Sequence, residues 1–171
     1  MRNYRILMAL ATILFAWSEA CAQKVTVQFD EAVDFRQFKT FAIRGGQRNS
    51  RNPALNSELV KKQIETDIAR GLTARGLTES SAEADLNVRY HFGTGRNSRV
   101  EAYPAGWRGL GTRYVRVPYA EGTLVIDLRD PRTRSLVWRG IASEEKSDPN
   151  KLEGKLDDVV RKTLAKYPPK K

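Results

Sequence analysis

Apolar and polar residues alternate in five short stretches of the chain, which is the pattern of strands that bury one face. We expect strands over residues 24–30, 39–43, 85–92, 124–128 and 136–138. The Gly45-Gly46 pair is expected to end the second strand, and the polar residues 47–52 are expected to form a loop.

The stretch EGTLVIDLRDPRTRSLVWRG, residues 121–140, has the clearest alternation and predicts a β-hairpin. Its turn, at residues 130–134, begins with Asp-Pro, which favours a type I turn. The register that keeps the apolar residues on one face sets Asp127 opposite or diagonal to Arg139. Such an ion pair contributes about 0.2–1 kcal/mol, less than the burial of Trp138. We therefore interpret the charged pair as structural and not as catalytic.

Two further stretches repeat apolar residues at three- and four-residue steps, which predicts two amphipathic helices. The first is expected to begin at Asn52-Pro53 and to end near Gly76, where glycine suits a left-handed cap. The second is expected to begin at Asp148-Pro149 and to stop at Pro168-Pro169. The apolar stripes are Leu55, Leu59, Val60, Ile64, Ile68 and Leu72 in the first helix, and Leu152, Leu156, Val159, Val160, Leu164 and Tyr167 in the second.

This order of elements predicts an α+β fold. Its simplest form is a mostly antiparallel sheet of about five strands with both helices packed on one face. Residues 23–171 are about one domain long, and no linker divides them.

Residues 93–122 are a long segment rich in Gly, Arg and Tyr, so we expect a long loop, interrupted by a short strand at 114–117. Loops longer than about 15 residues are uncommon and are often functional or disordered. Two interpretations stay open: a merely mobile loop, or a surface for an anionic partner, since arginine forks grip phosphates and aromatic rings favour interfaces. The candidate surface consists of Arg96, Arg99, Arg108, Arg113, Arg116, Trp107 and Tyr114.

Residues 1–22 combine two arginines, an uncharged apolar run and a group of small residues, which is typical of a bacterial export signal. The apolar run is about a dozen residues long, too short to span about 30 Å of hydrocarbon. Two forms of processing stay open. Cleavage after Ala20-Cys21-Ala22 makes Gln23 the first residue, whereas lipidation makes Cys21 a lipid-modified first residue. Because Cys21 is the only cysteine, no disulfide within the folded domain is expected.

The charge balance is basic. The whole chain has 30 basic and 20 acidic side chains, and removal of Arg2, Arg5 and Glu19 with the predicted signal leaves 28 and 19, a charge of +9. Summed positive charge attracts anionic groups. For an exported protein in the periplasm or at the outer membrane, these are lipid phosphates, lipopolysaccharide and acidic polymers, whereas nucleic acid is not expected there. The candidate partners are therefore anionic lipid, lipopolysaccharide or an envelope protein. Scattered charge that only keeps the protein soluble is the simpler interpretation.

No set of residues predicts catalysis, a metal site or a cofactor. His91 is the only histidine, and its strand neighbours Asn87 and Arg89 make a poor ligand set or triad. Glu144 and Glu145 are adjacent and point to opposite faces of an extended chain, so they cannot easily share a substrate atom. The glycine clusters at 93–95 and 106–111 lack the sequence context of a phosphate-binding loop.

Several motifs occur in a specific order along the chain. They are VxVxFD at 25–30, DFxxFKTF at 34–41, GLxxRGL at 71–77, ADLxV at 84–88, EGTLVIDLxD at 121–130, LVWRG at 136–140 and YPP at 167–169. In these motifs the chain resembles the bacterial envelope proteins of the domain of unknown function 4136 family. The resemblance implies an exported, often lipid-anchored protein without an assigned activity, and it supplies no catalytic residues.

The sequence thus predicts a non-enzymatic exported envelope protein, a binding or assembly module of the periplasm or outer membrane. Membrane contact is expected only through a lipid anchor or surface binding. The alternative is a hydrolase or transferase that acts on envelope glycans or lipids; converging carboxylates with strongly perturbed pKa values in a cleft favour that alternative.

Overall fold

The computed structural model describes residues 23–50, 53–105, 111–146 and 154–170. The side chains of residues 95–121 and 145–146 are outside this description. In chain order the elements are β1 (Gln23–Phe29), the 3-10 turn η1 (Phe35–Gln37), β2 (Thr40–Ser50), the 3-10 turn η2 (Pro53–Asn56), α2 (Glu58–Thr73), β3 (Thr78–Glu79), β4 (Leu86–Ala105), β5 (Gly111–Arg129), β6 (Leu136–Lys146) and α4 (Leu156–Leu164).

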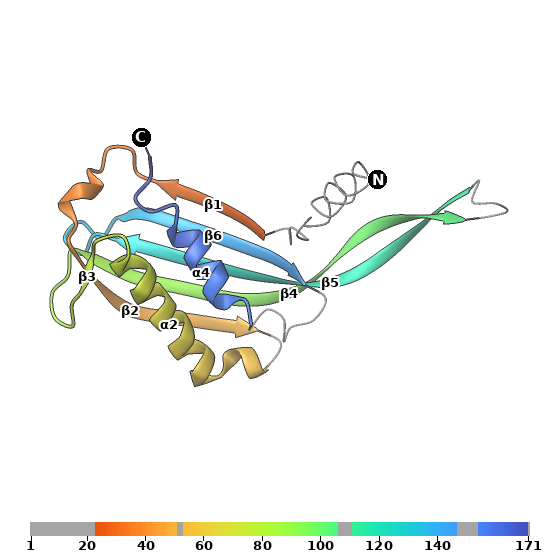
Figure 1. The fold of residues 1–171 in the computed structure, drawn as a ribbon, viewed down its shortest axis with the longest axis horizontal. Helices are drawn as coiled ribbons and strands as arrows, with labels where there is room; N and C mark the ends of the chain where they lie inside the picture. Colours follow the sequence, from red (N-terminus) through yellow and green to blue (C-terminus); the bar gives the residue numbers. More distant parts are fainter. Residues whose placement is uncertain (1–22, 51–52, 106–110, 147–153, 171) are drawn as a thin grey trace, which may run out of the picture.

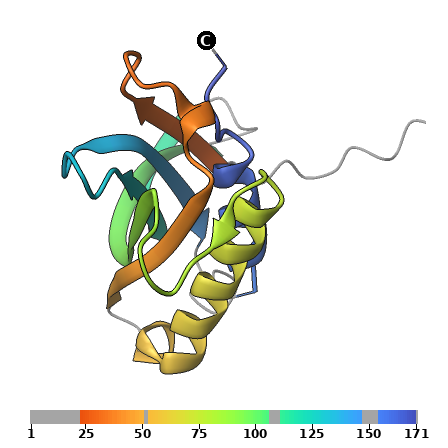
Figure 2. The ribbon, with the colours of Figure 1, turned by 90° about the vertical axis from the view of Figure 1, so that its left-hand side faces the viewer.

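The strands form one six-stranded sheet in the order β1-β6-β5-β4-β2-β3. Both α2 and α4 lie on one face of this sheet, as expected (Figures 1 and 2). The α+β class is confirmed, but the sheet is mixed: β2 runs parallel to β4 and β3, while the other pairs are antiparallel. A parallel pair needs a crossover, and α2 provides the one between β2 and β4.

The expected end of β2 at Gly45-Gly46 is wrong, because the strand continues to Ser50. A register shift between Ile43 and Gly45 marks a bulge, and Gly45 has φ +153°. Gly46 then lies directly against the ring of Tyr90 on β4. Bulges insert an extra residue without ending the pairing, so here the glycines permit the strand to continue.

The first helix begins later than expected, at Glu58. Its cap is Ser57, whose Oγ accepts from the Val60 amide at 3.3 Å, and Pro53 belongs to the preceding 3-10 turn. The predicted apolar stripe is buried except for Leu59, which is 79% exposed. The end of the helix is as predicted, since Gly76 has φ +87°.

The second helix carries Leu156, Val159, Val160 and Leu164 in the core, and Tyr167 follows them there. Its predicted start at Asp148-Pro149 and Leu152 lie outside the described residues. The helix ends at Leu164, before Pro168.

The core lies between the helices and the sheet. The predicted inward residues of three strands are fully or nearly fully buried: Leu86, Val88, Tyr90, Phe92, Leu124, Ile126, Leu128 and Trp138. Leu136, expected to share the face of Trp138, is only half-buried because a register shift follows Leu128. The opposite face of the sheet has no described helix over it (Figure 2).

Candidate functional site

The described residues of the predicted loop at 93–122 instead belong to two long paired strands, β4 and β5. The two strands pair from Asn87 with Arg129 to Ala105 with Gly111. The adjoining strands stop earlier, since the last pair of β2 with β4 is Ser50 with Thr94 and the last pair of β6 with β5 is Lys146 with Ala120. Within the described part of the chain, residues 95–105 and 111–119 therefore pair only with each other, and Figure 1 shows them extending as a two-stranded ribbon beyond the sheet.

The strand expected at 114–117 lies within β5. The expectation of a loop around it is wrong because alternation reports burial, and a projecting ribbon has no core to bury against. The register of this ribbon continues the one established by the buried halves of the same strands, near Val88 and Leu128.

The predicted anionic-partner surface lies mostly on this ribbon. Arg96 and Arg99 belong to β4, and Arg113, Tyr114 and Arg116 belong to β5. In the register Arg99 lies opposite Val117, and Tyr103 lies opposite Arg113. Trp107 and Arg108 lie outside the described residues. The described members of the surface thus belong to the two arms of one hairpin, and the surface stays a prediction.

His91 lies on β4 and is exposed, as predicted for a solvent-facing strand position. Its register neighbours are Val125 on β5 and Gln47 on β2. Neither neighbour is an acid or a hydroxyl residue, and the acid that shares a hollow with His91 is Asp127.

The two adjacent glutamates belong to β6. Glu144 is buried, 4% exposed, and its Oε1 lies 3.1 Å from Nζ of Lys155, just before α4. Glu145 lies opposite Glu121 in the register, and its side chain is outside the described residues. Glu144 is thus a buried partner of a lysine, which is a structural arrangement.

The Asp127–Arg139 pair forms as predicted, in the directly opposite position. Arg139 donates from Nε and Nη2 to the two carboxylate oxygens of Asp127, at 2.6 and 2.7 Å. These hydrogen bonds raise the pKa of the Arg139 guanidinium above its ordinary value. The paired geometry is the bidentate one in which arginine binds carboxylates most strongly.

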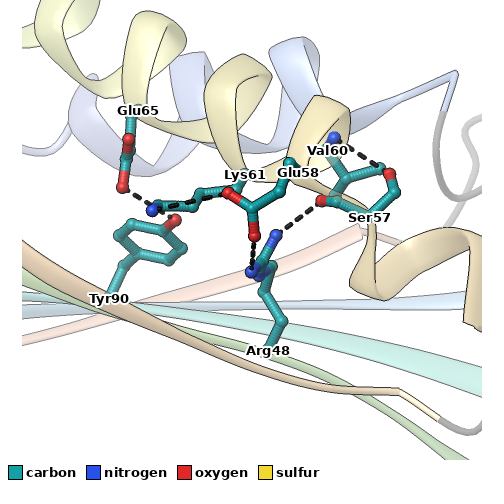
Figure 3. A network of polar contacts seen from close by, with 7 residues as sticks. All are labelled: Arg48, Ser57, Glu58, Val60, Lys61, Glu65 and Tyr90. Carbon is teal, nitrogen blue, oxygen red and sulfur yellow. Dashed lines mark hydrogen bonds and ion pairs between the residues drawn. The ribbon is translucent and has the colours of Figure 1, made fainter.

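A second polar network connects the sheet to the start of α2 on the helix-bearing face (Figure 3). Arg48 on β2 donates to the Ser57 carbonyl at 2.5 Å and to Glu58 Oε1 at 2.8 Å. Tyr90 donates to Glu65 Oε1 at 3.3 Å. Hydrogen bonding from Arg48 lowers the pKa of Glu58, and burial, followed by the Glu65 charge, raises the pKa of Tyr90.

Sequence reasoning did not find this network, because Arg48 falls in the residues expected to form a loop. In this network Arg48 donates to the cap residue Ser57 and to Glu58, and Tyr90 donates to Glu65. The arrangement therefore orients α2 on the sheet.

Metal-binding geometry is not found in the described ranges, where no three His, Cys, Asp or Glu side chains come close enough to share an ion. The helices in the same ranges include none that is long and apolar enough to cross a bilayer.

Comparison with solved structures shows a shared fold. The chain is similar to a PDZ domain protein from Parabacteroides distasonis, with 20% identity, a TM-score of 0.58 and coverage of 88% of this chain and 36% of that one. It therefore spans about a third of that protein's length. It is also similar to a PelC dodecamer variant from Paraburkholderia phytofirmans, with 13% identity, a TM-score of 0.50 and coverage of 84% and 95%.

No curated protein matches the chain. The sequence model of one family, described as a domain of unknown function, DUF4136, matches residues 25–169. This match covers nearly all of the chain that follows the predicted signal and agrees with the resemblance carried by the ordered motifs. The chain belongs to the DUF4136 family.

Proposed function

We propose that this protein is a non-enzymatic, exported envelope protein that binds an anionic partner through the β4–β5 ribbon. The partner class is anionic lipid, lipopolysaccharide or an acidic surface of an envelope protein. The proposal rests on the projecting ribbon, together with the arginines and aromatic residues along it.

A two-stranded ribbon is marginally stable in water, because it buries little apolar surface. Residues 95–105 and 111–119 have no third strand beside them in the described part of the chain. At about 3.3 Å per residue, an arm of this length reaches roughly 35 Å. A long projection with this composition favours contact with another molecule over a purely structural role.

Charge supports an anionic partner for this ribbon. Residues 23–171 have a formal charge of +9, and five arginines occur in the sequence of the two arms, at 96, 99, 108, 113 and 116, counting the connecting residues. Arginine binds phosphate through paired N–H groups, and an aromatic ring suits a site with one wet edge.

The contacts of the candidate catalytic side chains support a non-enzymatic role. Asp127 and Glu144 are each paired with a basic side chain. His91 is exposed and lines the same hollow as Asp127, whose two carboxylate oxygens both accept from Arg139.

The test is binding of the purified protein to anionic lipid vesicles before and after neutralisation of the ribbon arginines. Vesicle binding that is unaffected by these substitutions removes the ribbon from the proposal.

A further inference from the structure

The sheet face opposite the helices has a second basic feature, separate from the ribbon. A hollow on this face is lined by Arg44, Arg89, Arg129 and Arg139, together with Asp127 and His91. The lining thus contains four arginines and one carboxylate, and the Arg139 and Arg129 guanidinium groups lie within 4.0 Å of that carboxylate. Four strands contribute to it, β2, β4, β5 and β6, so residues far apart in the sequence create the charge together.

Strand register explains why the charges gather there. Arg89 on β4 lies opposite Asp127 on β5, and Asp127 lies opposite Arg139 on β6. Neighbouring strands are about 4.8 Å apart, so the three side chains form one row across the sheet. The two arginines therefore flank a single acid.

Asp127 holds one of these arginines in place without saturating it. It accepts from Nε and Nη2 of Arg139 at 2.6 and 2.7 Å. A guanidinium has five N–H donors in a planar fork. Three N–H donors of Arg139 are therefore not used by Asp127. The two hydrogen bonds to Asp127 fix the orientation of the guanidinium that carries them.

Arg129 adds an unused donor. Its Nη2 lies 4.0 Å from Oδ2 of Asp127, which is the limit of an ion pair. Its Nε atom is buried and has no hydrogen-bond partner in the described structure. Buried donors are ordinarily paired, so this N–H is available to an acceptor that enters the hollow.

The β2 side of the hollow is left open. Gly45 lies opposite Arg89 in the register, and a Cβ built there meets no described atom within 4 Å. Arg44 is the preceding residue on β2. Its guanidinium donates to the Asn87 side chain at 3.4 Å and to the Ala82 carbonyl, and these hydrogen bonds hold the Arg44 side chain at the edge of the hollow. Space next to the exposed Arg89 is therefore available to a small group.

We propose that this hollow binds the phosphate group of a soluble phosphate monoester. A phosphate dianion matches the surplus of arginine over carboxylate, and its oxygens accept the paired N–H groups that a guanidinium presents. Attraction to a membrane surface needs only exposed charge within reach of the headgroups. The buried Nε–H of Arg129 and the oriented fork of Arg139 instead suit a discrete ligand.

This site goes beyond the ribbon proposal and shares no residue with it. The hollow uses residues up to His91 on β4 and from Asp127 on β5, whereas the ribbon begins at residue 95. Either proposal can therefore fail while the other stands.

The experiment measures calorimetric binding of glycerol 3-phosphate at constant ionic strength, with glycerol as the uncharged control. The protein is expressed from its full sequence, residues 1–171, and purified in the form that the cell produces. We expect binding of glycerol 3-phosphate and none of glycerol. Arg89→Gln should weaken binding about tenfold or more, since it removes a charge-assisted contact.

Arg75→Gln is the matched control, because Arg75 is exposed just after the end of α2 and its substitution removes the same charge. It should leave the affinity unchanged. Arg89 is exposed, and its side chain takes part in no ion pair among the described residues, so the melting temperature of Arg89→Gln should equal that of the parent protein. A nitrogen-detected spectrum should also show the Arg129 Nε–H signal shifting with glycerol 3-phosphate.

Three results overturn the proposal. They are no binding of glycerol 3-phosphate at millimolar concentration, an equal loss of affinity in Arg75→Gln and Arg89→Gln, and phosphatidylglycerol vesicle binding that depends on Arg89 but is not displaced by glycerol 3-phosphate. The last result assigns the hollow to a membrane surface.

Discussion

Trp138 and Tyr167 pack edge to face, with ring centroids 5.8 Å apart and ring planes at 86°. Trp138 is on β6, and Tyr167 follows α4, so the contact joins the last strand to the segment after the last helix. Phe35 also packs edge to face with Tyr167, at 5.8 Å. An aromatic cluster thus ties three separate segments to one core.

Trp138→Ala should lower the free energy of unfolding by about 3–5 kcal/mol, because it removes a fully buried large ring and leaves a cavity. Chemical denaturation measures this change. Leu59→Ala is the control, since Leu59 is 79% exposed and its truncation should change stability by no more than about 0.5 kcal/mol. An unchanged melting temperature for Trp138→Ala contradicts the described core.

Gly46→Ala should destabilise the protein by about 1–3 kcal/mol through overpacking. A Cβ at this position lies 1.9 Å from the Cζ atom of Tyr90, so the ring has to move. Gly154→Ala is the control, because its Cβ meets no described atom within 4 Å. Equal thermal stability of the two variants contradicts the close approach of β2 to Tyr90.

Asp85 should make the stability depend on pH. Its Oδ2 atom accepts from the Lys39 and Thr40 amides, at 2.8 and 2.9 Å, and these hydrogen bonds lower the pKa of the carboxyl below its ordinary value. A lowered pKa in the folded state stabilises the protein above the pKa of the unfolded state, about 3.9. This contribution is lost as pH falls through the folded pKa.

The measurement compares Asp85→Asn with the parent protein by denaturation from pH 7 to pH 2.5. The parent protein should be more stable by a constant amount between pH 5 and 7, and the difference should shrink below about pH 4. If the stability difference between the parent protein and Asp85→Asn grows on acidification, the pKa of Asp85 is not lowered by folding.

The four ribbon substitutions Arg96→Gln, Arg99→Gln, Arg113→Gln and Arg116→Gln together should weaken flotation with phosphatidylglycerol vesicles. Each phosphate contact at a membrane surface contributes about 1 kcal/mol, so the loss should exceed tenfold. Neutralisation of four exposed basic side chains elsewhere, Arg36, Lys62, Arg75 and Lys166, is the control. If both quadruple variants lose the same affinity, the effect comes from net charge and not from the ribbon.

Mass spectrometry of the exported protein should show that the first residues are removed. An unmodified chain that begins at Gln23 indicates plain cleavage, and an acylated chain that begins at Cys21 indicates a lipid anchor. A mature protein that retains Met1 contradicts the predicted export signal.

The sequence by itself predicts which side chains face the core wherever burial follows from local periodicity. The inward positions of Leu86, Val88 and Tyr90 follow from alternation, and the left-handed Gly76 follows from the end of a helical stripe. Register within the 121–140 hairpin is also a local property, because keeping apolar residues on one face leaves few alignments. That constraint alone brings Asp127 and Arg139 together.

Only the tertiary structure shows the features that depend on pairing between strands distant in the sequence. Arg48 meets Glu58 only because β2 continues past its glycine bulge, and the ribbon continues only because β4 and β5 extend an alignment set in the core. The hollow around Arg89 likewise draws on strands whose order in the sheet differs from their order in the chain. Periodicity records which side of an element is buried, whereas the identity of the neighbour comes from the packing free energy of the whole sheet.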